Sequence, residues 1–387
     1  MGRKILQSTI KQKKKLLIAT DSFLPRWDGI ARFLAEMIPK LKNEYDITVL
    51  APAFKGHENI DFGIRIIWIK AFNFKISDYQ PAKFDNKKIS EEVNQADIVW
   101  IQTIGPIGAT AIKQAKKAKK PLLAYNHSIE WELASESFSQ IDPIKFIVEL
   151  AIWVMARRYY NKCDLLLVPS KQVENTLNRA GIKTPKKIVK MGIDSKKFMP
   201  SQNKEKSKKE VGLDKEDTII GFCGRLGREK DLVTLYRAFT QIQHEHEKVK
   251  LVIIGDGISK YKKMFNEKEN IIMTGAKNNV IPYLQAMDIF VLPSITETSS
   301  LATMEAMSCE LAVITTKVGS ISEYLVDKQN GMFFPKRNSY VLRKKIELLM
   351  KNPGMRKKLG EEARETIELN YSWEKTVAEI KEVLSKF

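Results

Sequence analysis

Three cysteines are too few and too scattered for a disulfide framework or a zinc site. Cys163, Cys223 and Cys309 are odd in number, far apart in the chain and never in a Cys-x-x-Cys pair. The four histidines show no metal-ligand spacing either. The composition argues against both kinds of site, and it predicts a reducing, cytoplasmic environment.

Long hydrophobic runs are absent as well. The most apolar long stretch, residues 144–155, is too short to span a bilayer and contains Glu149. Residues 1–15 are basic and polar, without the apolar core of a signal peptide, and we interpret them as a tail before the first strand. We therefore expect a protein that does not cross the membrane, while a peripheral position at its inner face stays open.

Acidic residues are outnumbered by basic ones. The net charge is +19 over 387 residues, and residues 1–194 carry 32 Lys and Arg against 20 Asp and Glu. This balance permits an anionic membrane surface, nucleic acid or an acidic substrate as partner, and it is also typical of organisms whose proteins are rich in lysine. No nucleic-acid-reading motif occurs and the basic residues are not interleaved with aromatic ones, so we expect no nucleic-acid partner.

Short apolar runs alternate with helical stretches, and this pattern occurs twice. The runs cover 16–20, 47–50, 98–102, 121–125 and 165–168, then 218–223, 250–254, 271–274, 289–292 and 312–315. Continuous apolar strands separated by helices indicate parallel sheets covered on both faces. The prediction is an α/β protein of two doubly wound, Rossmann-like domains, 16–195 and 196–371, with the polar segment 201–209 as a linker or loop. Ligands of such sheets bind beyond the carboxyl ends of the strands, so we expect the site in a central cleft between the domains.

Two further helices are predicted. Residues 372–387 begin with Ser372 as N-cap and place apolar side chains on one face, so this helix must pack on another part of the protein. Residues 144–160 are apolar on most sides. Two interpretations of that helix stay open: a buried crossover, which is the more usual case, or docking on lipid.

A basic loop follows the strand predicted at 218–223. Residues 224–230 contain Arg225 and Lys230 and precede a helix, whose first turn offers free backbone N–H groups and the positive end of a dipole. Two cations in that position suit a diphosphate. The alternative is that both are solvated surface residues.

Two carboxylates form a Glu-x7-Glu segment, Glu297 and Glu305. Glu297 lies in the loop after the strand 289–292, and Glu305 lies about one turn into the helix that begins near Leu301. Carboxylates accept hydrogen bonds from sugar hydroxyls, and the amides of 298–300 at the helix N-terminus suit phosphate. The alternative makes Glu305 a surface residue and Glu297 an aid to capping.

Gly29 and His127 are weaker candidates. Gly29 ends the loop after the first strand and lets a ligand approach the backbone, although no G-x-G-x-x-G or Walker loop is present. His127 follows the strand 121–125, where it suits a substrate contact or a structural role, and spacing alone favours the structural one.

Taken in this order, these segments resemble the group 1, or family four, glycosyltransferases, which are retaining enzymes with the GT-B fold. The resemblance covers nearly the whole chain and is most specific at 224–230, 252–257 and 297–305. Segments 164–170, 191–198, 319–323 and 371–374 agree, and 20–29 is similar to the opening of glycolipid-forming members. The resemblance implies transfer of a hexosyl unit from a nucleotide-sugar donor that binds in the C-terminal domain.

The resemblance also implies roles for single residues. Arg225 and Lys230 would bind the donor diphosphate, Glu297 the donor sugar and Glu305 the ribose. From the N-terminal domain, Gly29 would approach the donor phosphate and His127 the sugar. The region of Gly275 would line the base pocket, and residues 372–387 would cross back onto the N-terminal domain. Ser299, Ser300 and Leu301 would lie beside the donor.

The chain departs from the family at one place, since Ser300 and Leu301 stand where members often have Gly and Phe. That difference concerns the identity of the donor. No carboxylate is an obvious covalent nucleophile, and the sequence has no Asp-x-Asp. We therefore expect front-face displacement without a metal or other cofactor, in which the leaving diphosphate helps to deprotonate the acceptor.

The acceptor is open at this stage. A lipid or lipid-linked acceptor at the cytoplasmic face of the membrane fits the basic N-terminal half, which is the acceptor side in this fold. A soluble sugar or polysaccharide is the alternative. Two other enzymes of the same fold, a phosphorylase and a nucleotide-sugar epimerase, are further alternatives.

Overall fold

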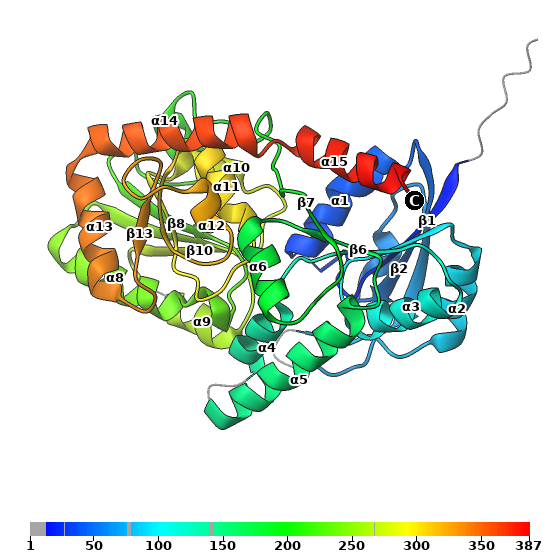
Figure 1. Ribbon diagram of the computed structural model, residues 1–387. Helices are drawn as coiled ribbons and strands as arrows, with labels where there is room; N and C mark the ends of the chain where they lie inside the picture. Colours follow the sequence, from blue (N-terminus) through cyan, green and yellow to red (C-terminus); the bar gives the residue numbers. More distant parts are fainter. Residues whose placement is uncertain (1–12, 27, 76–78, 139–141, 267) are drawn as a thin grey trace, which may run out of the picture.

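The structure, a computed structural model, describes residues 13–26, 28–75, 79–138, 142–266 and 268–387. It has two halves that lie side by side, each built on a parallel sheet covered by helices (Figure 1). The predicted α/β architecture with two doubly wound sheets is confirmed. Residues 1–12, the larger part of the predicted tail, lie outside the described residues.

The first sheet has the strand order β3-β2-β1-β4-β5-β6-β7. Its strands are β1 (Lys14–Ala19), β2 (Tyr45–Ala53), β3 (Arg65–Lys70), β4 (Ile98–Ile101), β5 (Leu122–Tyr125), β6 (Leu165–Val168) and β7 (Lys186–Ile188). The second sheet has the order β10-β9-β8-β11-β12-β13. Its strands are β8 (Thr218–Cys223), β9 (Val249–Ile254), β10 (Ile271–Gly275), β11 (Ile289–Leu292), β12 (Ala312–Thr316) and β13 (Met332–Phe334).

Most helices lie in the connections between strands, and the last three follow the last strand. The first half has α1 (Gly29–Leu41), α2 (Asn86–Gln95), α3 (Pro106–Lys117), α4 (Glu130–Phe138), α5 (Asp142–Tyr160) and α6 (Lys171–Arg179), with the 3-10 turn η1 (His57–Asn59). The rest of the chain has η2 (Arg228–Lys230), α7 (Lys204–Glu210), α8 (Leu232–Glu245), α9 (Ser259–Phe265), α10 (Ile281–Ala286), α11 (Leu301–Ser308), α12 (Ile321–Tyr324), α13 (Ser339–Lys351), α14 (Pro353–Asn370) and α15 (Trp373–Ser385).

Three edge strands, β3, β7 and β13, were missed in the sequence. Strands β7 and β13 have three residues each and are too short to show a periodic pattern. The predicted runs are the remaining, mostly central strands. Because most of those strands are covered on both faces, most of their positions are apolar, and this makes them visible in the sequence.

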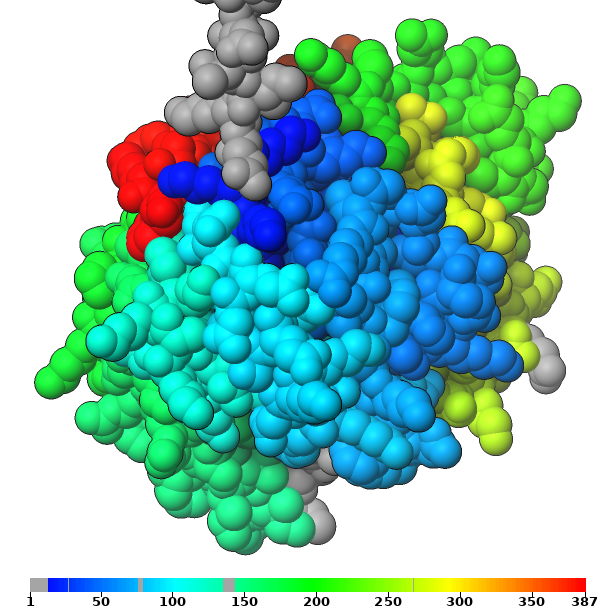
Figure 2. Space-filling view, turned by 90° about the vertical axis from the view of Figure 1, so that its right-hand side faces the viewer, coloured from blue at the N-terminus to red at the C-terminus, as the bar shows by residue number. Residues whose placement is uncertain are grey.

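Different helices cover the two faces of the first sheet, and alternate residues of each strand face them. Leu17 and Ala19 of β1 face the core that α2 and α3 cover, whereas Leu16 and Ile18 face the core that α1 covers. The last helix, α15, packs into that second core through Trp373, so the chain end returns to the first half. Figure 2 shows α15, in red, beside the blue N-terminal strand.

Two backbone hydrogen bonds fix this crossing. The Ile193 N–H donates to the Tyr371 carbonyl at 2.9 Å, and the Trp373 N–H donates to the Ile193 carbonyl at 3.0 Å. Ser372 caps α15, because its side chain accepts from the Lys375 N–H. The sequence predicted both this cap and the need of the helix for a packing partner.

The interpretation of 201–209 as a linker or loop is wrong for most of that segment. Residues Lys204–Glu210 form α7, capped by Asn203. Lys208 is 6% exposed, and its ammonium donates to the Asp217 carbonyl at 2.7 Å and pairs with Asp288 at 3.0 Å. Polar composition indicated solvent, but partners from other elements bury this lysine.

The interpretation of 144–160 as a buried crossover is wrong for one face of α5. Trp153, Ala156 and Tyr160 pack against the core of the first half. On the opposite side, Phe146 is 68% exposed and Ile147 is 64% exposed. The sequence showed that the helix is apolar but not how much of it the rest of the chain covers.

Candidate active site

The basic loop after β8 is held by glycines of two neighbouring strand ends. The Gly224 N–H donates to the Ile254 carbonyl at 2.9 Å. A Cβ on Gly255 would stand 1.9 Å from the Gly224 carbonyl oxygen, so only glycine fits there. Leu226 forms a bridge with Gly257. These contacts fix the backbone from which Arg225 and Lys230 extend.

Arg225 and Lys230 are each paired with a carboxylate. Arg225 Nη2 lies 2.5 Å from Glu229 Oε1, and Lys230 Nζ lies 2.5 Å from Glu297 Oε1. The Ser294 hydroxyl also donates to Glu297 Oε1, at 2.7 Å. Glu229 is only 3% exposed, so it holds the guanidinium in one orientation. The structure thus brings Arg225, Lys230 and Glu297 together, and neither cation is a free surface residue.

Glu305 is buried, and its partner comes from the other half of the molecule. It is 1% exposed in α11, which excludes the interpretation of Glu305 as a surface residue. The guanidinium of Arg32, in α1, spans the carboxylate: Nη2 contacts Oε1, and Nη1 lies 3.5 Å from Oε2. This ion pair joins the first turn of α1 to the site in the second half.

The residues that begin α11 have an unusual backbone. Ser300 has a φ of 51°, in the left-handed region, and its hydroxyl bonds Thr303 Oγ1 at 2.7 Å. This conformation gives a physical reason for the glycine that the family resembled by the sequence often has at this place. Ser299 is 6% exposed, and its hydroxyl has no hydrogen-bond partner within the described part of the chain. Leu301 contacts the cores of both halves.

His127 lies where β5 ends and is held on several sides. Its Nε2 is 2.8 Å from Gln102 Oε1, and its ring packs against Phe33 and Tyr125 at centroid distances of 4.9 and 4.5 Å. Burial lowers the pKa of His127 to about 3, against a smaller opposing effect of Asp28. The imidazole is therefore neutral near neutral pH, and Gln102 fixes its orientation.

Gly29 and Gly275 border open space. A Cβ on either residue would meet no atom within 4 Å. Gly29 begins α1, which Asp28 caps by accepting from Ile30 N and Ala31 N at 3.0 Å each. Gly275 ends β10 with a φ of 70°, which explains its glycine, whereas no such constraint applies to Gly29. The space beside Gly29 leaves room for a ligand.

Polar contacts join the two halves around these residues. Besides Arg32 and Glu305, Thr296 Oγ1 lies 3.3 Å from Glu132 Oε2, and the Gln172 N–H donates to Glu323 Oε1 at 2.9 Å. Arg32, Gln102 and Glu229 were not predicted as site residues from the sequence. Only Glu229 left a local signal, because it stands four residues after Arg225.

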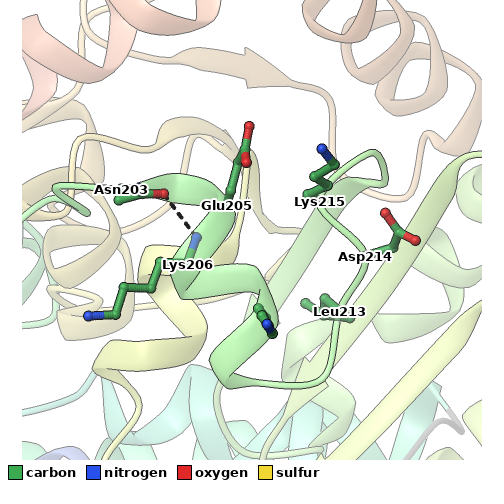
Figure 3. A pocket seen from close by; sticks show the side chains of 7 residues that line it. Asn203, Glu205, Lys206, Leu213, Asp214 and Lys215 are labelled. Carbon is green, nitrogen blue, oxygen red and sulfur yellow. Dashed lines mark hydrogen bonds between the residues drawn. The ribbon is translucent and has the colours of Figure 1, made fainter.

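Two other features of the surface lie apart from this group. A hollow of about 470 Å³ between α7 and the loop that follows it is lined by side chains of both charges, such as Glu205 and Lys215 (Figure 3). Glu245, His246 and Glu347 come within 4.8 Å of one another. Arg343 bonds both of these glutamates at 2.5 Å, so the cluster already holds a cation.

Comparison with known proteins identifies the family. The model of "Glycosyl transferases group 1" matches residues 203–366, and that of "Glycosyltransferase Family 4" matches residues 27–197. The chain belongs to the group 1 glycosyltransferases. It is therefore an enzyme, a hexosyltransferase with a nucleotide-sugar donor, and the family resemblance predicted from the sequence is confirmed.

Relatives of this glycosyltransferase cover most of its length. It is 24% identical to the alpha-monoglucosyldiacylglycerol synthase of Streptococcus pneumoniae, over 81% of this chain and 74% of that protein. It is also 24% identical to the GDP-mannose-dependent alpha-mannosyltransferase of Corynebacterium glutamicum, over 82% and 76%. The structure of Anabaena HepE in complex with UDP and glucose superposes with a TM-score of 0.78 at 17% identity, over 97% of this chain and all of that one. This likeness confirms the GT-B fold.

No helix within the described residues of this glycosyltransferase has the length and apolarity needed to cross a bilayer.

Proposed function

We propose that this glycosyltransferase moves a hexosyl unit, with retention of the anomeric configuration, from a nucleoside-diphosphate sugar to a lipid or lipid-linked acceptor. The observation that carries the donor part is the pair of oriented cations after β8. Arg225 and Lys230 each lie 2.5 Å from a carboxylate oxygen, at the carboxyl end of a buried parallel strand. That is where such sheets bind phosphorylated ligands.

Each part of the donor would be bound by residues of its own. Arg225 and Lys230 bind the diphosphate, and Glu229 keeps the guanidinium aligned for it. Glu297 accepts from donor-sugar hydroxyls, and Glu305 from the ribose. The open backbone at Gly29 lets a phosphate approach from the first half. In this proposal the guanidinium and the ammonium contact the leaving diphosphate directly, and they take the role that a metal has in other enzymes.

The reaction we propose is a front-face displacement. The acceptor hydroxyl attacks the anomeric carbon from the side of the leaving group, and the diphosphate oxygen takes up its proton. His127 stays neutral and offers a fixed hydrogen-bonding ring toward the sugar, since Gln102 holds its orientation. The protein contributes position and charge stabilisation, and no side chain forms a covalent intermediate.

The acceptor part rests on two supports. One is the net basic charge of residues 1–194, the half that carries the acceptor in this fold. The other is the resemblance to a diacylglycerol glycoside synthase named above. A soluble sugar acceptor is the competing proposal. A phosphorylase would require inorganic phosphate, and an epimerase would turn over donor without any acceptor.

A ligand panel tests the donor site. Thermal unfolding would be followed with UDP, GDP, ADP and their sugars, for the wild type, Arg225→Ala and Lys230→Gln. Since a ligand that binds only the folded state raises its stability, one diphosphate should raise the unfolding temperature of the wild type. Both variants should lose most of this shift and most of the turnover.

The exposed Arg237→Ala, on α8 of the same half, is the matched control and should respond like the wild type. Near-normal turnover in both site variants would contradict the proposed role of the two cations.

A further inference from the structure

Among the described helices, α5 exposes the largest number of large apolar side chains, and they lie on its outer face. Its exposed large side chains are Ile144, Phe146, Ile147, Leu150 and Val154, with exposed fractions of 47, 68, 64, 46 and 50%. At 100° per residue these positions fall on one side of the helix. Elsewhere in the described part of the chain, exposed large apolar residues stand singly or in pairs, such as Leu369 of α14.

The same face ends in positive charge. Arg157 and Arg158 are exposed in the last turn of α5 and continue the apolar stripe. From residue 143 to 160, no exposed position carries an acidic side chain, and Glu149 is turned partly inward. Lys113 and Lys162 lie nearby, each less than 6 Å from the Tyr159 ring (5.6 and 5.7 Å). An apolar stripe that ends in arginines is complementary to acyl chains beneath anionic headgroups.

The inner face holds α5 firmly to the first half. Trp153 Nε1 donates to the Ala180 carbonyl at 3.0 Å, and Tyr160 is 1% exposed. The helix lies at the edge of the molecule, and its N-terminal end projects beyond the body (Figure 1). A flat surface can therefore reach the outer face without displacing any other helix.

The position of α5 relates it to the candidate active site. It packs against α4, which contacts η2, the turn that carries Lys230. Glu132 of α4 lies 3.3 Å from Thr296, which is next to Glu297. Only two residues separate His127 from the start of α4. A surface bound to α5 would thus be separated from the candidate active site by α4 alone.

We infer that the outer face of α5 is a docking surface for an anionic lipid bilayer, in which the apolar side chains enter the interface and Arg157 and Arg158 bind headgroup phosphates. The inference rests on the proposed function, to which it adds the surface that brings a lipid acceptor to the site. Binding of this kind is interfacial and reversible, because one helix face buries few methylene groups.

Vesicle co-sedimentation of the full chain tests the inference. Vesicles of phosphatidylcholine alone would be compared with vesicles that also contain phosphatidylglycerol, at low and high salt. The wild type should bind the anionic vesicles, and salt should weaken binding. The double variant Ile147→Ser/Leu150→Ser should bind at least about ten-fold more weakly. Replacing Arg157 and Arg158 by Gln should weaken binding roughly five-fold per arginine and flatten the salt dependence.

Leu369→Ser is the control, because it removes a leucine of the other half that is more exposed than Leu150 (67% against 46%) and should bind as the wild type does. Wild-type protein that binds no vesicles, or α5 variants that bind as tightly as the wild type, would overturn the inference. So would a dimer that the double variant splits, since a second copy would then cover the face.

The thermal shift with nucleoside diphosphates, measured on the same variants, separates the two proposals. A full shift in the α5 variants shows that fold and donor site are intact when vesicle binding is lost. Vesicle binding without any diphosphate response would contradict the donor proposal and leave the docking surface supported.

Discussion

The carboxylate of Glu305 has one partner in the structure and a second one in the proposed donor complex. Arg32 spans it in the structure, and the proposed donor would place ribose hydroxyls on the same oxygens. Because Glu305 is 1% exposed and Arg32 spans its carboxylate, we expect a donor ribose to displace part of this contact. Arg32 would then turn toward the negatively charged donor.

The neutral, buried ring of His127 predicts how the stability of the protein depends on pH. Its pKa is about 3 in the folded protein and about 6.5 when exposed. Between about pH 6.5 and about pH 3, His127 is protonated in the unfolded chain but not in the folded one. The unfolding free energy that His127 contributes therefore falls as the pH falls from neutral toward about 3. Between about pH 7 and about pH 5, the wild type should lose roughly 1–2 kcal/mol of unfolding free energy more than His127→Gln.

Urea unfolding at the two pH values measures this difference. The exposed His244→Gln is the control and should follow the wild type. An equal loss in wild type and His127→Gln would show that His127 is protonated in the folded state, and the neutral-ring role proposed for it would fail.

The start of α11 gives a prediction at the element scale. Ser300, the N-cap residue of this helix, has a φ of 51°, which costs a non-glycine residue on the order of 1 kcal/mol. Ser300→Gly relieves that strain but loses the hydrogen bond to Thr303, so unfolding free energy should rise by about 0.5 kcal/mol or stay level. Ser300→Ala keeps the strain and loses the bond, so it should destabilise by about 1 kcal/mol.

Urea unfolding of the two variants checks this order. If Ser300→Ala proved more stable than Ser300→Gly, the backbone at this position would not be strained as the structure has it. Binding of the donor panel to Ser300→Gly would also show whether the serine side chain limits the space beside the sugar.

The ion pair between Arg32 and Glu305 gives the prediction at the scale of the whole molecule. It connects α1 in one half with α11 in the other, so its loss should destabilise the protein and loosen the contact between halves. Arg32→Ala leaves a buried carboxylate without a cation and should cost about 3 kcal/mol. Glu305→Gln in the same background should recover part of this loss, because the charge is then absent.

Unfolding followed by circular dichroism and by tryptophan fluorescence tests the coupling. All six tryptophans belong to residues 1–153 or to α15, so fluorescence follows the first half only. In Arg32→Ala the two signals should separate more than in the wild type. If the two signals of Arg32→Ala changed together, at the same midpoint as in the wild type, the ion pair would contribute nothing to the coupling between the halves.

The sequence by itself determined the elements whose signal is local. The buried strands showed as continuous apolar runs, because both faces of each sheet are covered, and Ser372 marked the start of the last helix. Arg225, Lys230, Glu297 and Glu305 could be selected as candidates because each stands just after a predicted strand or just inside a predicted helix.

Only the tertiary structure decided what pairs with what. Arg32 and Glu305 are 273 residues apart, and no local pattern predicts that they meet. Lys208 looked like a solvated lysine, yet Asp288 from a distant loop buries it. The sequence left open whether α5 is buried or faces lipid, and the structure shows its outer face exposed among the described residues. Periodicity states which side of an element is apolar, whereas burial depends on neighbours that only the folded chain supplies.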